Sequence, residues 1–111
     1  MKALLLVLAL LTGTAQAQEA VRASFAKVHR LSGAHAVLVV VNTDTLGWTD
    51  GRTVYLSSRL DLESRIAREF IAAHELAHIR LGHQAPTTKE QEREADEDAV
   101  RLLVRAGLAT P

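Results

Sequence analysis

The segment His74-Glu75-Leu76-Ala77-His78 carries the residue types of a metal-dependent hydrolase. On an α-helix, histidines four residues apart project only about 40° from each other, so both imidazoles can reach one ion. Glu75 lies about 100° round from His74, beside the ion rather than on it. A carboxylate there suits a general base acting on water held by the metal. The segment therefore predicts a zinc site with Glu75 as the catalytic residue.

The residues around the two histidines strengthen this prediction. The side chains that share their side of the helix are apolar: Ala67, Phe70, Ile71, Ala77 and Leu81. His74 and His78 are therefore expected in the middle of the apolar face. Two unpaired imidazoles buried there would lose their hydration without compensation, and a shared zinc ion removes that cost.

A tetrahedral catalytic zinc needs a third protein ligand, and the next helix offers Glu92. Glu92 stands where the apolar stripe of that helix would otherwise continue, and Asp96 lies one turn further on. A buried carboxylate at Glu92 needs a cation. A second one at Asp96 suits the free N–H of a ligand histidine. The other acidic residues between 90 and 98 are expected to face solvent.

Hydrophobic periodicity predicts the elements that position these residues. The apolar spacing of residues 19–31 indicates an amphipathic helix that ends at Ser32-Gly33, and residues 36–41 read as a buried strand. Asp50-Gly51 indicates a hairpin turn between strands at 46–49 and 53–56.

Two helices follow the predicted sheet and carry the chemistry. The first is expected from about Asp61 to Leu81, with Gly82 ending it. The second begins after Pro86, where Thr87 and Glu90 fit a capping box, and runs to about residue 106. The predicted fold class is α+β, with an N-terminal helix, a small three-stranded sheet, the motif helix and the Glu92 helix.

Residues 1–17 have the pattern of a secretory signal peptide. Lys2 supplies a positive charge, residues 3–11 are an unbroken apolar run, and Ala15-Gln16-Ala17 resembles a cleavage site. The run falls well short of the roughly 20 residues that span a bilayer. We expect cleavage after Ala17, an exported (periplasmic or secreted) domain of residues 18–111, and no stable membrane anchor.

Composition excludes several classes of function. The 111 residues include 13 basic and 13 acidic side chains and no cysteine. One domain is therefore the upper limit. Disulfides, cysteine-based zinc fingers and cysteine nucleophiles are excluded. The balanced charge argues against a nucleic-acid-binding surface.

Taken together, these motifs resemble the HtpX, BepA and Oma-type gluzincin peptidases. The resemblance covers residues 42–111 and rests on the HExxH segment, the following Gly82-His83, the E-x-x-A-D pattern of residues 92–96 and the ending Ala106-Gly107-Leu108-Ala109-Thr110-Pro111. It implies a minimal zincin-like domain with one zinc per chain, bound by His74, His78 and Glu92. It further implies Glu75 as general base, Asp96 behind a ligand histidine, and a polypeptide substrate paired with a sheet edge.

The sequence leaves two main hypotheses open, a zinc endopeptidase and a zinc-stabilised regulatory or binding module with weak activity. Retention of Glu75 favours the enzyme, whereas the small size and the lack of a clear oxyanion donor favour the module. Tyr55 and His83 are the nearest candidate donors, but their positions suit a packed strand residue and a helix-end residue. A helical domain without metal is a third, weaker alternative.

Overall fold

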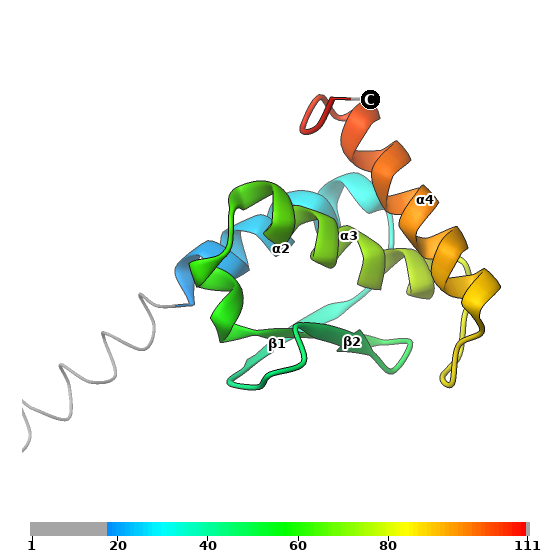
Figure 1. Ribbon diagram of the computed structural model, residues 1–111, viewed down its shortest axis with the longest axis horizontal. Helices are drawn as coiled ribbons and strands as arrows, with labels where there is room; N and C mark the ends of the chain where they lie inside the picture. Colours follow the sequence, from blue (N-terminus) through cyan, green and yellow to red (C-terminus); the bar gives the residue numbers. More distant parts are fainter. Residues whose placement is uncertain (1–17, 111) are drawn as a thin grey trace, which may run out of the picture.

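The computed structural model describes residues 18–110 and shows an α+β fold, which confirms the predicted fold class (Figure 1). The elements in chain order are α2 (Glu19–Ser32), β1 (Val37–Val41), β2 (Gly47–Thr49), β3 (Thr53–Ser57), the 3-10 helix η1 (Ser58–Leu62), α3 (Arg65–Arg80) and α4 (Lys89–Arg105). The predicted signal peptide lies outside the described residues. Within the described part, no helix has both the length and the apolar character needed to cross a bilayer.

The three strands form a mixed sheet in the order β1-β3-β2. Strand β3 is central, parallel to β1 and antiparallel to β2. Figure 1 shows the helices on one side of this sheet, with α3 running between the sheet and α4. Strand β2 is therefore an edge strand, and α3 packs against it as well as against α2 and α4.

The core lies between the helices and the inner face of the sheet. Alternate residues of β3, Val54 and Leu56, point into it and are at most 1% exposed. The other main contributors are Val21, Phe25 and Val28 of α2, Leu60 of η1, Ala72, Ala73 and Leu76 of α3, and Ala99, Leu102 and Leu103 of α4. These side chains hold α3, and the chemistry it carries, against both the sheet and α4.

The prediction of a buried strand at residues 36–41 was wrong in one respect. The segment does form strand β1, but Val37 is 66% exposed and Val39 is 38% exposed. The helices cover only one face of the sheet, so alternate side chains of this edge strand face solvent. A continuous apolar run does not distinguish this half-buried strand from one buried on both faces.

The start of the motif helix also differs from the prediction. Asp61 lies in η1, and α3 begins at Arg65 after Ser64, whose hydroxyl accepts a hydrogen bond from the N–H of Ala67. Asp61 instead accepts a 2.9 Å hydrogen bond from the N–H of Val21, in the first turn of α2. It therefore satisfies a helix terminus 40 residues away, an arrangement that local sequence does not reveal.

The capping box of α4 lies one residue later than predicted. Thr88 and Gln91, rather than Thr87 and Glu90, exchange the two side-chain-to-backbone hydrogen bonds. The shift by one residue releases Thr87 from a capping role. Its hydroxyl bonds instead to the side chain of Glu92.

Candidate metal centre

His74 and His78 lie one turn apart on α3 and face α4. Their Nε2 atoms are 3.1 Å apart, and their rings meet edge to face at a centroid distance of 4.7 Å. Both side chains are shielded from solvent, at 15% exposed for His74 and 6% for His78. The helical spacing therefore brings the two imidazole nitrogens to one point, as the sequence predicts.

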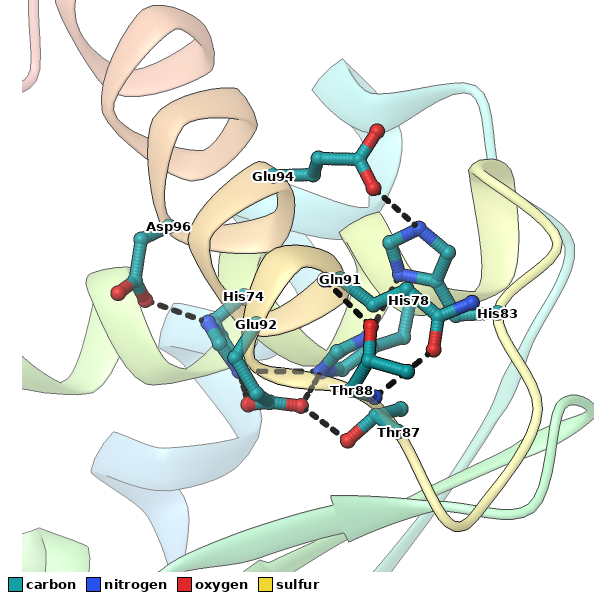
Figure 2. Close-up of polar contacts among 9 residues, drawn as sticks. All are labelled: His74, His78, His83, Thr87, Thr88, Gln91, Glu92, Glu94 and Asp96. Atoms are coloured by element: carbon teal, nitrogen blue, oxygen red, sulfur yellow. Dashed lines mark hydrogen bonds and ion pairs between the residues drawn. The ribbon is translucent and has the colours of Figure 1, made fainter.

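Glu92 completes a group of three at this point (Figure 2). Its Oε1 lies 3.1 Å from Nε2 of His74, and its Oε2 lies 3.0 Å from Nε2 of His78. Ligand atoms about 2.0–2.1 Å from a tetrahedral zinc ion lie roughly 3.3 Å from one another. The spacing of these nitrogen and oxygen atoms is close to that value, so the donor set fits a metal ion.

The helix-helix contact explains how Glu92 reaches the histidines. The buried positions that follow it on α4 are Ala95 and Ala99, both 0% exposed, and α3 is the main partner of α4. Small side chains allow two helix backbones to approach closely. An ion pair between Arg80 of α3 and Asp98 of α4 joins the two helices further along.

The histidine face is not the centre of the buried stripe of α3, contrary to the prediction. Glu69, Ala72, Ala73 and Leu76 form its centre, on the opposite side of the helix, and the buried residues Glu75, Ala77 and His78 extend it round to the histidine side. Because Glu69 is a charged residue, the sequence does not indicate that its side of the helix is buried. The Glu69 carboxylate is fully buried because Lys27 and Arg65 pair with it, at 2.9 Å and 2.6 Å. His74 and His78 instead line the contact with α4.

The carboxylates of α4 are more exposed than predicted. Glu92 is 45% exposed and Asp96 57% exposed, so the premise that both are buried was wrong. Asp96 nevertheless lies behind a histidine, with Oδ1 2.8 Å from Nδ1 of His74. The two atoms are close enough for an ion pair, although Nδ1 has no aligned hydrogen bond among the described residues.

Sequence reasoning did not identify Thr87 as part of this site. Its hydroxyl donates a 2.5 Å hydrogen bond to Oε2 of Glu92 (Figure 2). Burial by itself raises the pKa of Glu92, but this hydrogen bond and the neighbouring imidazoles hold the pKa below its usual value. Glu92 is therefore kept as a carboxylate, the form that binds a cation.

The role of His83 was also incompletely predicted. Its ring is only 7% exposed, and its Nδ1 lies 3.0 Å from Nδ1 of His78. Burial lowers the pKa of His78, and this favours the neutral imidazole that can bind a metal. Gly82 could have indicated this position of His83 from sequence, because a glycine that ends a helix turns the next residue back toward the last turn.

Glu75 lies between α3 and strand β2, on the wall of a pocket that two of the candidate ligands, His78 and Glu92, also line. The residue is 8% exposed, and burial is the main cause that raises its pKa from 4.5 to about 7. Gly47 of β2 packs beside it: a Cβ at residue 47 would lie 3.4 Å from Cγ of Glu75, within ordinary van der Waals contact. The group can therefore exchange a proton near neutral pH.

The pocket beside Glu75 has a volume of about 190 Å³ and opens along the edge strand β2. Its lining residues are Gly47, Trp48, Thr49, Glu75, His78, His83, Ala85, Thr87 and Glu92. The Tyr55 hydroxyl is not among them. It lies 3.5 Å from Oδ2 of Asp50, and its ring stacks on Trp48 at 5.0 Å.

Comparison with known proteins adds one finding. Residues 64–108 match the model of the family described as Peptidase U49. The matched segment begins at the residue that caps α3 and includes all of α3 and α4, and therefore His74, Glu75, His78 and Glu92. The match indicates a peptidase, without specifying the HtpX, BepA or Oma type. No curated protein and no solved structure matches the chain.

Proposed function

We propose that the protein is an exported, zinc-dependent endopeptidase that cleaves unfolded or extended polypeptides. The observation that carries this proposal is the meeting of His74, His78 and Glu92 within 4.8 Å of one another, beside the buried carboxyl of Glu75. The peptidase match over the same two helices supports it.

Two imidazoles and one carboxylate are a donor set typical of catalytic zinc sites with three protein ligands. A zinc ion bound by His74, His78 and Glu92 would supply a Lewis acid that polarises a peptide carbonyl and acidifies water. Thr87 orients Glu92 through a 2.5 Å hydrogen bond, and Asp96 lies behind His74, with its Oδ1 2.8 Å from Nδ1. Such outer partners hold ligand atoms in the geometry that the ion requires.

Glu75 is the general base of the proposed reaction. Without metal, burial raises its pKa to about 7, and a nearby cation favours the ionised form, which can accept a proton from water. It would take a proton from the attacking water and return it to the departing amine. Because it lies on the pocket wall, between α3 and β2, it would lie beside a peptide bound along β2.

Strand β2 provides the surface for the polypeptide. The hydrogen bonds Ser57 N–H to Leu46 and Asp50 N–H to Thr53 show that alternate residues of this strand face β3. Gly47 and Thr49 therefore direct their main-chain groups toward the outer edge, where none of residues 18–110 forms a further strand. An extended peptide added there would bind through its backbone, with little selection by sequence.

Export is proposed from residues 1–17, whose charge, apolar run and Ala15-Gln16-Ala17 ending suit a signal peptide. Fractionation of expressing cells tests it. A processed chain that begins at Gln18 outside the cytoplasm supports export, and an unprocessed chain confined to the cytoplasm contradicts it.

The decisive experiment compares casein cleavage by the zinc-loaded chain and by Glu75→Gln. We expect cleavage that is lost in Glu75→Gln while zinc content stays at one per chain. Glu63→Gln, at an exposed carboxyl outside the pocket, is the matched control and should cleave normally. Equal cleavage by wild type and Glu75→Gln would refute the role of Glu75.

One observation favours the second candidate, a zinc-stabilised regulatory module. Neither residue expected near the oxyanion is free to serve it, because the Tyr55 hydroxyl faces Asp50 and the His83 ring is engaged by His78. An oxyanion donor contributes about 10²–10³ in rate, so its lack would leave a weak enzyme. Zinc bound at full occupancy without casein cleavage would support the module.

A further inference from the structure

Two buried imidazoles face each other at the end of α3. Nδ1 of His78 and Nδ1 of His83 are 3.0 Å apart, and the rings are inclined at 61° (Figure 2). Their side chains are only 6% and 7% exposed. Two ring nitrogens at this distance share one proton, so one ring donates and the other accepts.

The direction of that hydrogen bond follows from the other nitrogen of His78. Its Nε2 points at Nε2 of His74 and at the carboxylate of Glu92, at 3.1 Å and 3.0 Å. A metal bound there takes the Nε2 lone pair, which leaves the ring proton of His78 on Nδ1. Nδ1 of His83 must then accept.

The far side of His83 is consistent with this direction. When Nδ1 accepts, the proton of the neutral ring lies on Nε2. That atom faces a carboxylate, because Oε1 of Glu94 lies 3.5 Å away. The contacts therefore form a line from the metal ligand His78 through His83 to Glu94.

The backbone explains why residue 83 reaches His78. Gly82 adopts φ +74°, and the N–H groups of Gly82 and His83 donate to the carbonyls of Ile79 and His78, at 3.1 Å and 2.9 Å. This helix ending brings the side chain at 83 onto the side chain at 78, and an apolar pair commonly occupies these two positions. Burying an imidazole there instead costs free energy unless it is hydrogen-bonded.

We propose that His83 is a positioning residue, which accepts the Nδ1 proton of His78 and so holds that ligand with its Nε2 lone pair directed at the metal. The inference rests on the metal site of the proposed function and extends it to a residue outside the ligand set. Glu94 is proposed to hold the His83 tautomer from its other side.

The tautomers can be read directly on the unmodified protein. The full chain is labelled with ¹⁵N-histidine and loaded with zinc, and long-range ¹H–¹⁵N spectra identify the protonated nitrogen of each ring. We expect the proton on Nδ1 of His78 and on Nε2 of His83. A zinc-loaded His83 protonated on Nδ1 overturns the proposal, whatever the behaviour of any variant.

Two substitutions separate hydrogen bonding from packing. His83→Phe keeps a ring but has no acceptor, and its zinc affinity should fall about 10- to 100-fold. His83→Asn places a carbonyl oxygen near the position of Nδ1, and it should recover most of the affinity. Urea unfolding of the zinc-free proteins reports any packing effect separately. Equal zinc affinity of His83→Phe and wild type would overturn the proposal.

The same titrations distinguish this inference from the proposed function. A wild-type chain that binds no zinc refutes the metal site, and the inference falls with it. If wild type and His83→Phe bind zinc with the same high affinity, only the role of His83 is refuted. Whether casein is cleaved does not enter either result.

Discussion

Substitution of Glu75 by Gln should change how the stability of the zinc-free protein depends on pH. Burial raises the pKa of Glu75 from 4.5 to about 7, so the folded chain holds this proton more tightly than the unfolded chain. The stabilisation is complete below pH 4.5 and is lost as the pH rises through 7. The difference between the two pKa values corresponds to about 3 kcal/mol, most of which is lost between pH 5 and pH 8.5.

Urea unfolding of the chelator-treated proteins measures this effect. The free energy of unfolding of wild type, relative to that of Glu75→Gln, should fall by about 2–3 kcal/mol from pH 5 to pH 8.5. The comparison between the two proteins removes the contributions of titrating groups that do not interact with Glu75; His74 and Glu92 do interact with it. Glu63→Gln alters an exposed carboxyl and should follow wild type.

Zinc should reduce the difference, because a nearby cation favours the ionised form of Glu75. Parallel pH profiles for wild type and Glu75→Gln without metal would refute the reasoning, since they would show that burial of this carboxyl has no cost. If zinc does not change this difference between wild type and Glu75→Gln, Glu75 does not lie close enough to the metal to interact with it.

Three further predictions concern packing, the third ligand and the metal. Gly47→Ala places a Cβ 3.1 Å from methyl carbons of Leu56 and Ile71, so it should lower the free energy of unfolding in urea by about 1–3 kcal/mol; an unchanged value would contradict the close packing of β2 on α3. Thr87→Val removes the 2.5 Å hydrogen bond to Glu92 and should weaken zinc binding in a competition titration about tenfold, whereas wild-type affinity would show that the bond is dispensable. Zinc at 100 times its Kd should add about 2.7 kcal/mol to folding, and a Tm that a chelator leaves unchanged would argue against the site.

The sequence by itself determined the features that depend on local geometry. The spacing of His74 and His78 puts both imidazoles on one side of any helix they occupy, and Gly82 ends that helix with the turn that was predicted. The turn residues Asp50-Gly51 likewise identified the hairpin between β2 and β3. These features follow from helix and strand periodicity, which is a property of neighbouring residues.

Only the tertiary structure decided what covers each face. The sequence did not reveal that Lys27 and Arg65 would pair with a buried Glu69, or that the histidine face would pack against α4. Nor did it reveal that Thr87 would reach Glu92, because that depends on a capping box one residue away from the predicted one.

The same distinction applies to the candidate metal centre as a whole. Residues 74 and 78 share a face because of the helical repeat, but Glu92 joins them only because α4 packs on α3 and brings residues 18 positions apart to 3.1 Å. Local periodicity sets the direction of a side chain, whereas packing between elements sets its neighbours. The motif could therefore be identified from sequence, and the arrangement that completes it depends on the fold.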